Sequence, residues 1–209
     1  MIVVAGPPGS GKSSRFPLSY YEADFFNADD RAAELNSGSY HKIPAEIRAK
    51  VNREFERWIL DRIQSRQSFA IETTLRSPIT FEQARLAREH GFRTAMEYVI
   101  PGTVDECVRR IMERSYRGGH SGSERLVREI YEKSTKNLVK ALDFEESAVE
   151  ILRIYDNSRL GESVREVLSF RRGRPQFIAN EIPAWLEVLF KGTKFEMAAL
   201  REDLRSRER

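Results

Sequence analysis

A glycine-rich segment near the start of the chain has the residue spacing of a phosphate-binding loop. The run "GPPGSGKS" at 6–13 matches the pattern G-x-x-x-x-G-K-[ST] at every fixed position. In this pattern backbone N–H groups surround an anion, the lysine contacts the β- and γ-phosphates of a nucleoside triphosphate, and the serine hydroxyl is a magnesium ligand. We therefore expect Lys12 to bind phosphates and Ser13 to bind Mg²⁺. The other loop residues expected around the nucleotide are Gly6, Pro7, Pro8, Gly9, Ser10, Gly11 and Ser14.

The residues on either side of this loop also fit a nucleotide site. The apolar run at 2–5, "IVVA", is typical of a strand that is buried on both faces. A helix that begins near Gly11 would direct its positive end at bound phosphates. An ordinary Gly/Pro turn between a strand and a helix is the alternative, and the agreement of pattern and setting argues against it.

Two further segments carry polar side chains where strands are expected to end. Asp29 and Asp30 follow the second apolar run, and in a doubly wound sheet the carboxyl ends of the strands line the site. Asp29 is a candidate for the acid that takes the proton of an acceptor hydroxyl, whereas Asp30 fits better as a helix N-cap. Glu72, Thr74 and Arg76 follow the third apolar run. They would contact a substrate on the same rim, or else cap the helix that follows.

A segment rich in glycine and arginine joins two helical patterns at 114–128. Its small residues suit a mobile lid, and arginines on a lid can close over phosphates. The arginines are Arg114, Arg117, Arg125 and Arg128. Solvated charge at a helix end is the alternative for each of them. His120 in the same segment is interpreted as a structural residue of the lid rather than as a base.

Alternating apolar runs and helical patterns predict how these residues are positioned. Strands are expected at 2–5, 24–27, 68–72, 94–100 and 151–155, and helices at 11–20, 44–66, 78–90, 103–116, 124–143 and 183–190. The alternation predicts an α/β fold with a doubly wound, mainly parallel five-stranded sheet. "VREVLSF" and "RPQFIAN" around Arg172-Gly173 predict a C-terminal hairpin. We expect a core at 1–160 and an appendage at 161–209 packed on the same domain, with a charged tail at 194–209 that is either helical or frayed.

The composition limits the classes of function. The 209 residues are enough for one sizeable α/β domain, and 32% of them are charged. The net charge of +3 suits anionic substrates but is too small to indicate a nucleic-acid partner. One cysteine, Cys107, allows no internal disulfide, and it fits a buried apolar position better than a nucleophile. A single cysteine fits a reducing, cytoplasmic compartment, and because no apolar stretch is long enough to span a bilayer we expect no membrane partner.

A phosphate-binding loop alone does not identify a reaction, because motors, GTPases, transporters and kinases share it. The sequence has no guanine-reading N-K-x-D segment, and no glutamate directly follows an acid at the end of an apolar run, as it does in many ATP-hydrolysing machines. A kinase of small molecules is the remaining class. Such a kinase needs an acid near the acceptor hydroxyl and cations around the transferred phosphoryl group.

The ordered set of motifs resembles the zeta toxin family of P-loop kinases, especially its chromosomal zeta-like branch. The segments that carry the resemblance are "GPPGSGKS", "FFNADD", "IETTLRS" with "ARLAREHGF", "ERSYRGGH" with "VREIYEKSTKNL", "IYDNS" and "IPAWLEVL". Together they extend over residues 1–190. The series G-G-H, Y-x-x-S-x-x-N-L and D-N-S is the specific part, since the phosphate-binding loop occurs in many families.

This resemblance implies a P-loop NTPase core of nucleoside-kinase type that uses ATP and Mg²⁺. The implied reaction is transfer of a phosphoryl group to the sugar 3′-hydroxyl of UDP-N-acetylglucosamine. The implied partner is a small antitoxin protein that covers the ATP site.

The resemblance also implies roles for individual residues. Asp29 matches the family's catalytic acid, and Arg114 and Arg128 match two arginines that act on the triphosphate. The acceptor-sugar rim is matched by Glu72 and Thr74, with Arg76 beside them. Asn157, in the run Asp156-Asn157-Ser158, lies where related kinases contact the adenine end of ATP.

Two departures from the family pattern keep alternatives open. "SGSERL" follows Gly-Gly-His where relatives often carry Asp-Val-Pro, and "REI" before Tyr131 replaces a run of arginines. The sequence therefore leaves three functions as alternatives. The first is a zeta-like kinase acting on UDP-N-acetylglucosamine. The second is a kinase of another hydroxyl compound, such as a nucleoside, sugar or antibiotic, and the third is an ATP-binding regulatory protein with weak catalysis.

Overall fold

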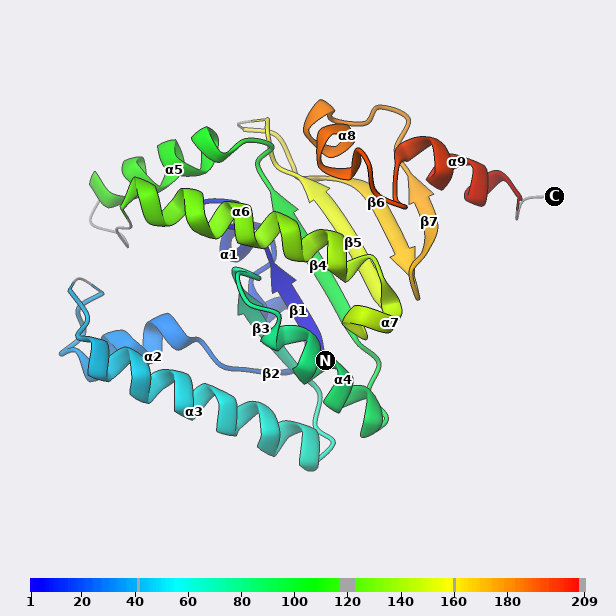
Figure 1. Cartoon of the computed structure of the whole chain (residues 1–209). Helices are drawn as coiled ribbons and strands as arrows, with labels where there is room; N and C mark the ends of the chain where they lie inside the picture. The colour runs from blue at the N-terminus through cyan, green and yellow to red at the C-terminus, as the bar shows by residue number, and fades with distance from the viewer. Residues whose placement is uncertain (41, 117–122, 160, 207–209) are drawn as a thin grey trace.

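A mostly parallel β-sheet organises the chain. The computed structural model describes residues 1–40, 42–116, 123–159 and 161–206. In these residues seven strands form one sheet in the order β2-β3-β1-β4-β5-β6-β7 (Figure 1). The strands are β1 Ile2–Ala5, β2 Asp24–Phe25, β3 Phe69–Thr73, β4 Ala95–Ile100, β5 Ile151–Asp156, β6 Arg165–Arg171 and β7 Arg174–Ile178. The first five pair in parallel and the last two are antiparallel, so the predicted mixed α/β class is confirmed.

The C-terminal hairpin extends the sheet, which the sequence analysis did not anticipate. All five predicted strands are present, but β6 pairs along the whole of β5, and the sheet has seven strands in the described residues instead of five. The turn is tight because Arg172 and Gly173 both have positive φ angles, 49° and 72°, as a two-residue hairpin turn requires. The hairpin gives the backbone groups on the outer edge of β5 hydrogen-bond partners that they would otherwise lack.

The helices agree with the predicted ranges except at a few places. They are α1 Lys12–Arg15, the 3₁₀ helix η1 Leu18–Tyr20, α2 Ala28–Leu35, α3 Ala45–Gln64, α4 Ile79–Glu89, α5 Val104–Tyr116, α6 Glu124–Ala141, α7 Phe144–Ser147, α8 Ala184–Phe190 and α9 Met197–Ser206. The helix expected at 11–20 is wrong as one element. It ends at Arg15 because Pro17 disfavours helical backbone at Phe16, whose φ is −132°. Helices α2 and α7 were not predicted as elements.

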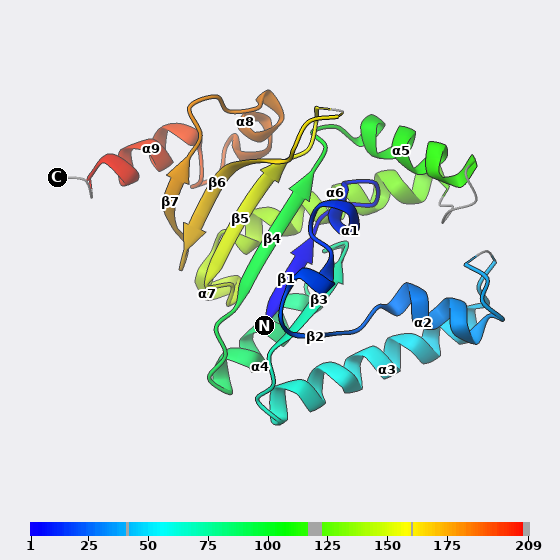
Figure 2. The ribbon, with the colours of Figure 1, turned by 180° about the vertical axis from the view of Figure 1, so that it is seen from behind.

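Helices lie on both faces of the sheet. Figure 1 shows α4, α6 and α7 in front of the central strands, and Figure 2 shows α1 on the opposite face. Side chains agree with this arrangement, since alternate residues of a strand point to opposite faces. Tyr98 on β4 reaches Ser134 of α6, with 2.9 Å between the two hydroxyl oxygens. On the other face the rings of Tyr155 and Phe16 lie 4.7 Å apart.

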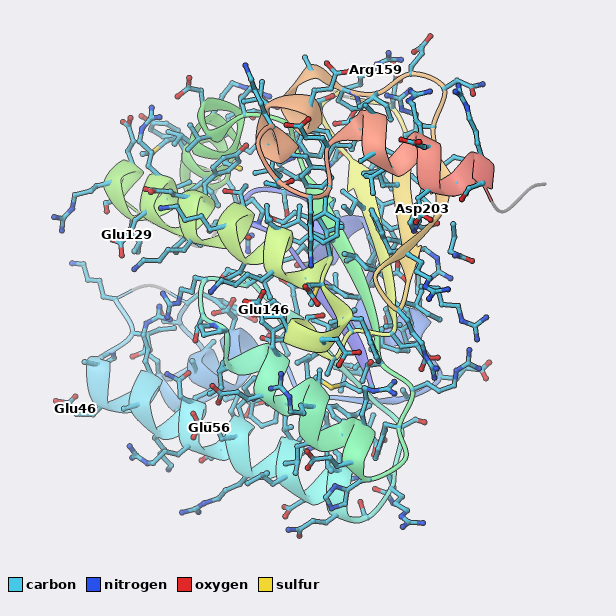
Figure 3. All side chains as sticks on the ribbon, turned by 45° about the vertical axis from the view of Figure 1, so that its right-hand side comes forward. Glu46, Glu56, Glu129, Glu146, Arg159 and Asp203 are labelled. Carbon is cyan, nitrogen blue, oxygen red and sulfur yellow. The ribbon has the colours of Figure 1, made fainter. Side chains whose placement is uncertain are left out.

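The main core lies between the sheet and the helices of the first face. Its fully buried side chains include Phe69, Ile71, Met96, Tyr98 and Leu138. The helices keep polar outer surfaces: Glu46 and Glu56 lie on the exposed side of α3, as Figure 3 shows. Among the described helices, none combines the length and the apolar character needed to cross a lipid bilayer.

The buried hydroxyl pair between β4 and α6 should be energetically coupled. Tyr98→Phe leaves the Ser134 hydroxyl buried without this partner, and Ser134→Ala does the same to the Tyr98 hydroxyl. Each single change should lower the free energy of unfolding by about 1–3 kcal/mol, the penalty of an unpaired buried polar group. The double variant should lose clearly less than the sum of the two losses. Urea unfolding of all four proteins measures the coupling, and strictly additive losses would contradict it.

Candidate active site

The glycine-rich loop follows β1, which lies between β3 and β4 near the middle of the sheet. Lys12 begins α1 and is only 7% exposed. Its ammonium donates hydrogen bonds to the carbonyl oxygens of Gly6 at 2.9 Å and Pro7 at 3.1 Å. A Cβ atom at Gly6 would collide with the Val99 carbonyl oxygen, and Gly11 has a φ of +93°. The loop therefore winds closely around the lysine, and this path needs glycine at both positions.

Charged groups from three other segments act on Lys12. Burial lowers the pKa of Lys12 below its usual value, and the Glu72 carboxylate is the largest influence in the opposite direction. Asp29 also raises this pKa, whereas Arg114 lowers it. Glu72 makes a direct contact with Lys12, since its carboxylate lies 3.8 Å from the ammonium. Asp29 and Arg114 act on Lys12 more weakly.

Glu72 lies directly against the loop. Its Oε2 accepts a hydrogen bond from the Ser13 hydroxyl at 2.8 Å, and its Oε1 is 3.8 Å from the Lys12 ammonium. Both contacts follow from the sheet register, which pairs Glu72 on β3 with Val4 on β1. The sequence analysis assigned Glu72 to the acceptor rim, with a helix cap as the alternative, and not to the glycine-rich loop. A carboxylate and a hydroxyl side by side are the hard oxygen donors that Mg²⁺ prefers, so this pair fits a magnesium ion.

Asp29 occupies the first turn of α2, but Asp30 does not cap this helix. The N-cap is Asn27, whose Oδ1 accepts hydrogen bonds from the backbone N–H groups of Asp29 at 3.1 Å and Asp30 at 3.2 Å. The Asn27 amide also donates to the Asp30 carboxylate at 2.6 Å, and the Tyr40 hydroxyl donates to it at 2.8 Å. The expectation for Asp30 is therefore wrong, because the helix begins three residues earlier than a cap at that position allows. The side chain of Asp29 is exposed beside the loop.

The segment after β3 is held in an unusual conformation. Leu75 is fully buried and has a φ of +54°, which costs a residue with a Cβ on the order of 1–2 kcal/mol. Its N–H donates to the Thr73 hydroxyl at 3.1 Å. The predicted rim residues Thr74 and Arg76 flank Leu75, with Thr74 half-buried and Arg76 exposed. The direction in which Thr74 and Arg76 project therefore depends on this one strained residue.

The exposed Arg76 has a weak electrostatic influence on helix α6. The pKa of Glu129 on α6 is lowered mainly by Lys133, and more weakly by Arg125 and Arg76. Figure 3 shows Glu129 on the outer part of α6. Arg125 is itself exposed on this helix. The rim therefore extends from β3 towards the helix that carries the second predicted group of arginines.

The predicted arginines have different surroundings. Arg114 lies in the last turn of α5 and acts on Lys12 as described above. Arg128 instead contacts acids near the start of α5 and α6: it donates to Asp105 at 2.7 Å and to Glu124 at 2.9 Å. Arg117 and His120 lie outside the described residues. The structure thus brings Arg114 to the loop and gives Arg128 acidic neighbours.

Asn157 contacts the glycine-rich loop itself. Its side-chain amide is buried and donates to the Ser10 carbonyl oxygen at 2.8 Å, and a Cβ atom at Gly11 would lie 2.5 Å from this nitrogen. Its own carbonyl oxygen accepts a hydrogen bond from Arg110 on α5 at 2.8 Å. Next to it, Asp156 accepts from the Trp185 indole of α8 at 3.2 Å. Asp156-Asn157-Ser158 therefore links the loop to α5 and to the C-terminal part of the chain.

The sequence analysis used the polar residues on the inner face of α6 only as part of the family resemblance and assigned them no role. Tyr131, Ser134 and Asn137 recur every third residue and face the sheet. The Tyr131 hydroxyl donates to the Gly102 carbonyl oxygen at 2.8 Å, and the Asn137 amide donates to the Leu75 carbonyl oxygen at 2.9 Å. The signal was present as Y-x-x-S-x-x-N-L, a polar stripe on an otherwise apolar helix face. The pattern does not identify the partners of these three residues, because the partners lie on distant segments of the chain.

Among the solved structures that resemble this chain is one that matches it over its full length. It is a chain from the PezAT chromosomal toxin–antitoxin system of Streptococcus pneumoniae, with a TM-score of 0.59 and 16% sequence identity, and the match covers 100% of this chain and 84% of that chain. The two chains share a fold. The resemblance to zeta toxins is thereby confirmed at the level of the fold.

Other comparisons add less. A chain of the Pnkp1/Rnl/Hen1 RNA repair complex matches with a TM-score of 0.47 and 16% identity, over 66% of this chain and 45% of that chain. That likeness is too low to carry an argument. No protein-family model and no curated protein sequence matches the chain significantly.

The N-cap of α2 should contribute measurably to stability. Asn27→Ala removes the acceptor of the Asp29 and Asp30 N–H groups and should lower the free energy of unfolding by about 1 kcal/mol. Asn52→Ala, at an exposed position inside α3, is the matched control and should be neutral or slightly stabilising. Urea unfolding measures both. Equal effects of the two changes would show that Asn27 does not cap the helix.

Proposed function

We propose that this chain is a P-loop kinase that transfers the γ-phosphoryl group of ATP, with Mg²⁺, to a hydroxyl group of a small molecule. One observation carries the proposal: Glu72 lies 3.8 Å from the buried Lys12 ammonium and 2.8 Å from the Ser13 hydroxyl of the glycine-rich loop, and charges on Asp29 and Arg114 also act on Lys12. Phosphoryl transfer needs this combination, because an acid must orient the acceptor while cations stabilise the charge of the transferred group.

The proposed nucleotide site is the loop at 6–14 with the first turn of α1. Lys12 contacts the phosphates, the backbone N–H groups surround them, and Asn157 holds the loop in place. Ser13 and Glu72 fit a magnesium ion because their oxygen atoms are neighbours, 2.8 Å apart. When bound, this ion neutralises charge on the phosphates and orients them. We propose a core at 1–160 and an appendage at 161–209 packed on the same domain.

The proposed catalytic acid is Asp29. It accepts the proton of the acceptor hydroxyl as the hydroxyl oxygen forms its bond to the γ-phosphorus and the bond from this phosphorus to the bridging oxygen of ADP breaks. Arg114 approaches from the end of α5 and stabilises negative charge on the transferred group. Arg128 is proposed for the same task, which requires it to exchange its contacts with Asp105 and Glu124 for phosphate oxygens.

The proposed acceptor is UDP-N-acetylglucosamine, phosphorylated at the sugar 3′-hydroxyl, with Glu72, Thr74 and Arg76 on the acceptor side. The motif set supports this choice, and the likeness in fold to a toxin–antitoxin protein agrees with it. We also propose a small antitoxin as protein partner and a cytoplasmic location. The contact of Glu72 with Ser13 favours a second candidate, a kinase of another hydroxyl compound, because it draws Glu72 towards the phosphate side.

A direct assay distinguishes these functions. Purified protein with ATP, Mg²⁺ and UDP-N-acetylglucosamine should yield an acceptor that carries one added phosphate, detected by mass spectrometry. Lys12→Ala should give no product. Asp29→Asn should bind ATP normally but lose roughly a hundredfold or more in rate if Asp29 is the general base. Asp30→Asn is the matched control and should retain most of the activity, since Asp30 pairs with Asn27 and Tyr40.

The other outcomes of this assay are equally informative. A near-normal rate in Asp29→Asn would remove Asp29 from the mechanism. Transfer to a different hydroxyl compound alone would replace the acceptor and keep the kinase. ATP binding without transfer to any acceptor in a broad screen would support a regulatory protein, and absence of nucleotide binding would overturn the whole proposal.

Nucleotide binding should take up protons at alkaline pH. Burial lowers the pKa of Lys12 in the free protein, and phosphate charges beside the ammonium raise this pKa on binding. Between the lowered pKa and the raised one, the complex holds more protons than the free protein, so affinity should fall as pH rises through this interval. Calorimetry of ATP binding in two buffers with different ionisation enthalpies measures the uptake. Uptake of the same size in Lys12→Met would contradict the assignment.

A further inference from the structure

The loop between β3 and α4 keeps a conformation that its own residues do not favour. Leu75 has a φ of +54°, a region that residues with a Cβ rarely adopt, and its side chain is fully buried. The hydrogen bond from its N–H to the Thr73 hydroxyl, at 3.1 Å, is local and could form in several loop conformations. Something outside the loop must therefore select this one.

Asn137 supplies the long-range restraint. It lies on α6, 62 positions away in the sequence, is 7% exposed, and its Nδ2 donates to the Leu75 carbonyl oxygen at 2.9 Å. The helix that carries it is itself anchored to the sheet by Ser134, which bonds Tyr98 of β4, and by Tyr131, which bonds the Gly102 carbonyl oxygen. Helix α6 is therefore fixed in place, and through Asn137 it restrains the carbonyl group of the strained Leu75. The peptide that carries this carbonyl joins Leu75 to Arg76.

We propose that Asn137 is a positioning residue for the acceptor side of the active site. By holding the Leu75 carbonyl, it sets the directions in which Thr74 and Arg76 project from the loop. The inference rests on the proposed kinase function for the consequence on catalysis. The restraint on the loop itself does not depend on that function.

Asn157 provides a matched comparison within the same chain. It is equally buried, and its Nδ2 also donates to a backbone carbonyl oxygen, that of Ser10, at 2.8 Å. The two asparagines therefore make the same kind of bond to different loops. Asn157 holds the glycine-rich loop on the nucleotide side, and Asn137 holds the loop that carries the predicted acceptor rim. If both bonds position their loops, the two alanine variants should fail in opposite ways.

The first experiment measures the loops without any acceptor. Hydrogen–deuterium exchange is followed in wild type, Asn137→Ala, Asn157→Ala and the control Ser134→Ala. Asn137→Ala should increase exchange at 73–77 by about tenfold or more and leave 6–14 close to wild type; Asn157→Ala should do the reverse. Ser134→Ala removes one anchor of the helix but leaves the Tyr131 anchor and the Asn137 bond to Leu75, so exchange at 73–77 should stay much closer to wild type than in Asn137→Ala. Equal increases across the protein in Asn137→Ala would overturn the proposal.

The second experiment measures catalysis with UDP-N-acetylglucosamine as the probe. Asn137→Ala should raise the acceptor KM or lower kcat by about tenfold or more, with an unchanged dissociation constant for ATP, because a small displacement of a substrate-positioning group is costly. Asn157→Ala should weaken ATP binding and leave the acceptor KM within about twofold. If Asn137→Ala weakened ATP binding as strongly as it changed the acceptor KM or kcat, the result would also contradict the assignment.

Failure of the proposal can be told apart from failure of the proposed function. A wild-type protein that binds no ATP overturns the kinase, whereas the exchange experiment still decides the role of Asn137. Thermal unfolding is recorded first for every variant. Asn137→Asp, which keeps the side-chain shape but replaces the donor nitrogen by oxygen, serves where Asn137→Ala does not fold, and it should show the same local exchange. If neither variant folds, Asn137 supports the whole fold and the positioning role is wrong.

Discussion

The burial of one ammonium group is the constraint on which the site depends. A lysine that is 7% exposed must find hydrogen-bond partners and opposite charge inside the protein, because desolvation disfavours its charged form. The carbonyl oxygens of Gly6 and Pro7 are the hydrogen-bond partners, and they are available only because the loop winds back over the lysine. Glu72 on the neighbouring strand supplies the opposite charge. Three features therefore stabilise the buried charge of Lys12 together: the path of the loop, the position of β3 beside β1, and the acid at the end of β3.

Three loops around this site are held by neutral donors. Asn157, Asn137 and Tyr131 each hold a loop by donating to a backbone carbonyl oxygen. In the place of Asn157, which contacts the glycine-rich loop, an arginine or lysine would add positive charge near a lysine whose protonation is already disfavoured by burial. A neutral amide fixes the backbone of the loop without adding to the charges that act on Lys12.

Sequence patterns predicted the parts of the structure that local chemistry determines. The strands, the long helices and the glycine-rich loop follow from periodicity and turn residues, and the structure contains them close to the predicted ranges. Pro17 also indicates the break after α1, but the pattern of the surrounding residues favours one continuous helix. Asn27 was overlooked as N-cap because Asp30 is as good a cap by residue type, and only the helix start decides between them.

The contacts that could not be predicted join residues distant in the sequence. Ser13 and Glu72 are 59 positions apart, and Leu75 and Asn137 are 62 apart. The type and spacing of one residue in such a pair do not identify the other residue. The two are brought together only by the order of the strands and the placement of the helices. Long-range contacts also hold the two loops separately: Asn157, directly after β5, holds the glycine-rich loop, and Asn137 of α6 holds the loop after β3. These two anchors share no side chain, so residues 74–77 can change while Asn157 still holds the glycine-rich loop. Glu72 is the exception, because its bond to Ser13 joins the two sides directly.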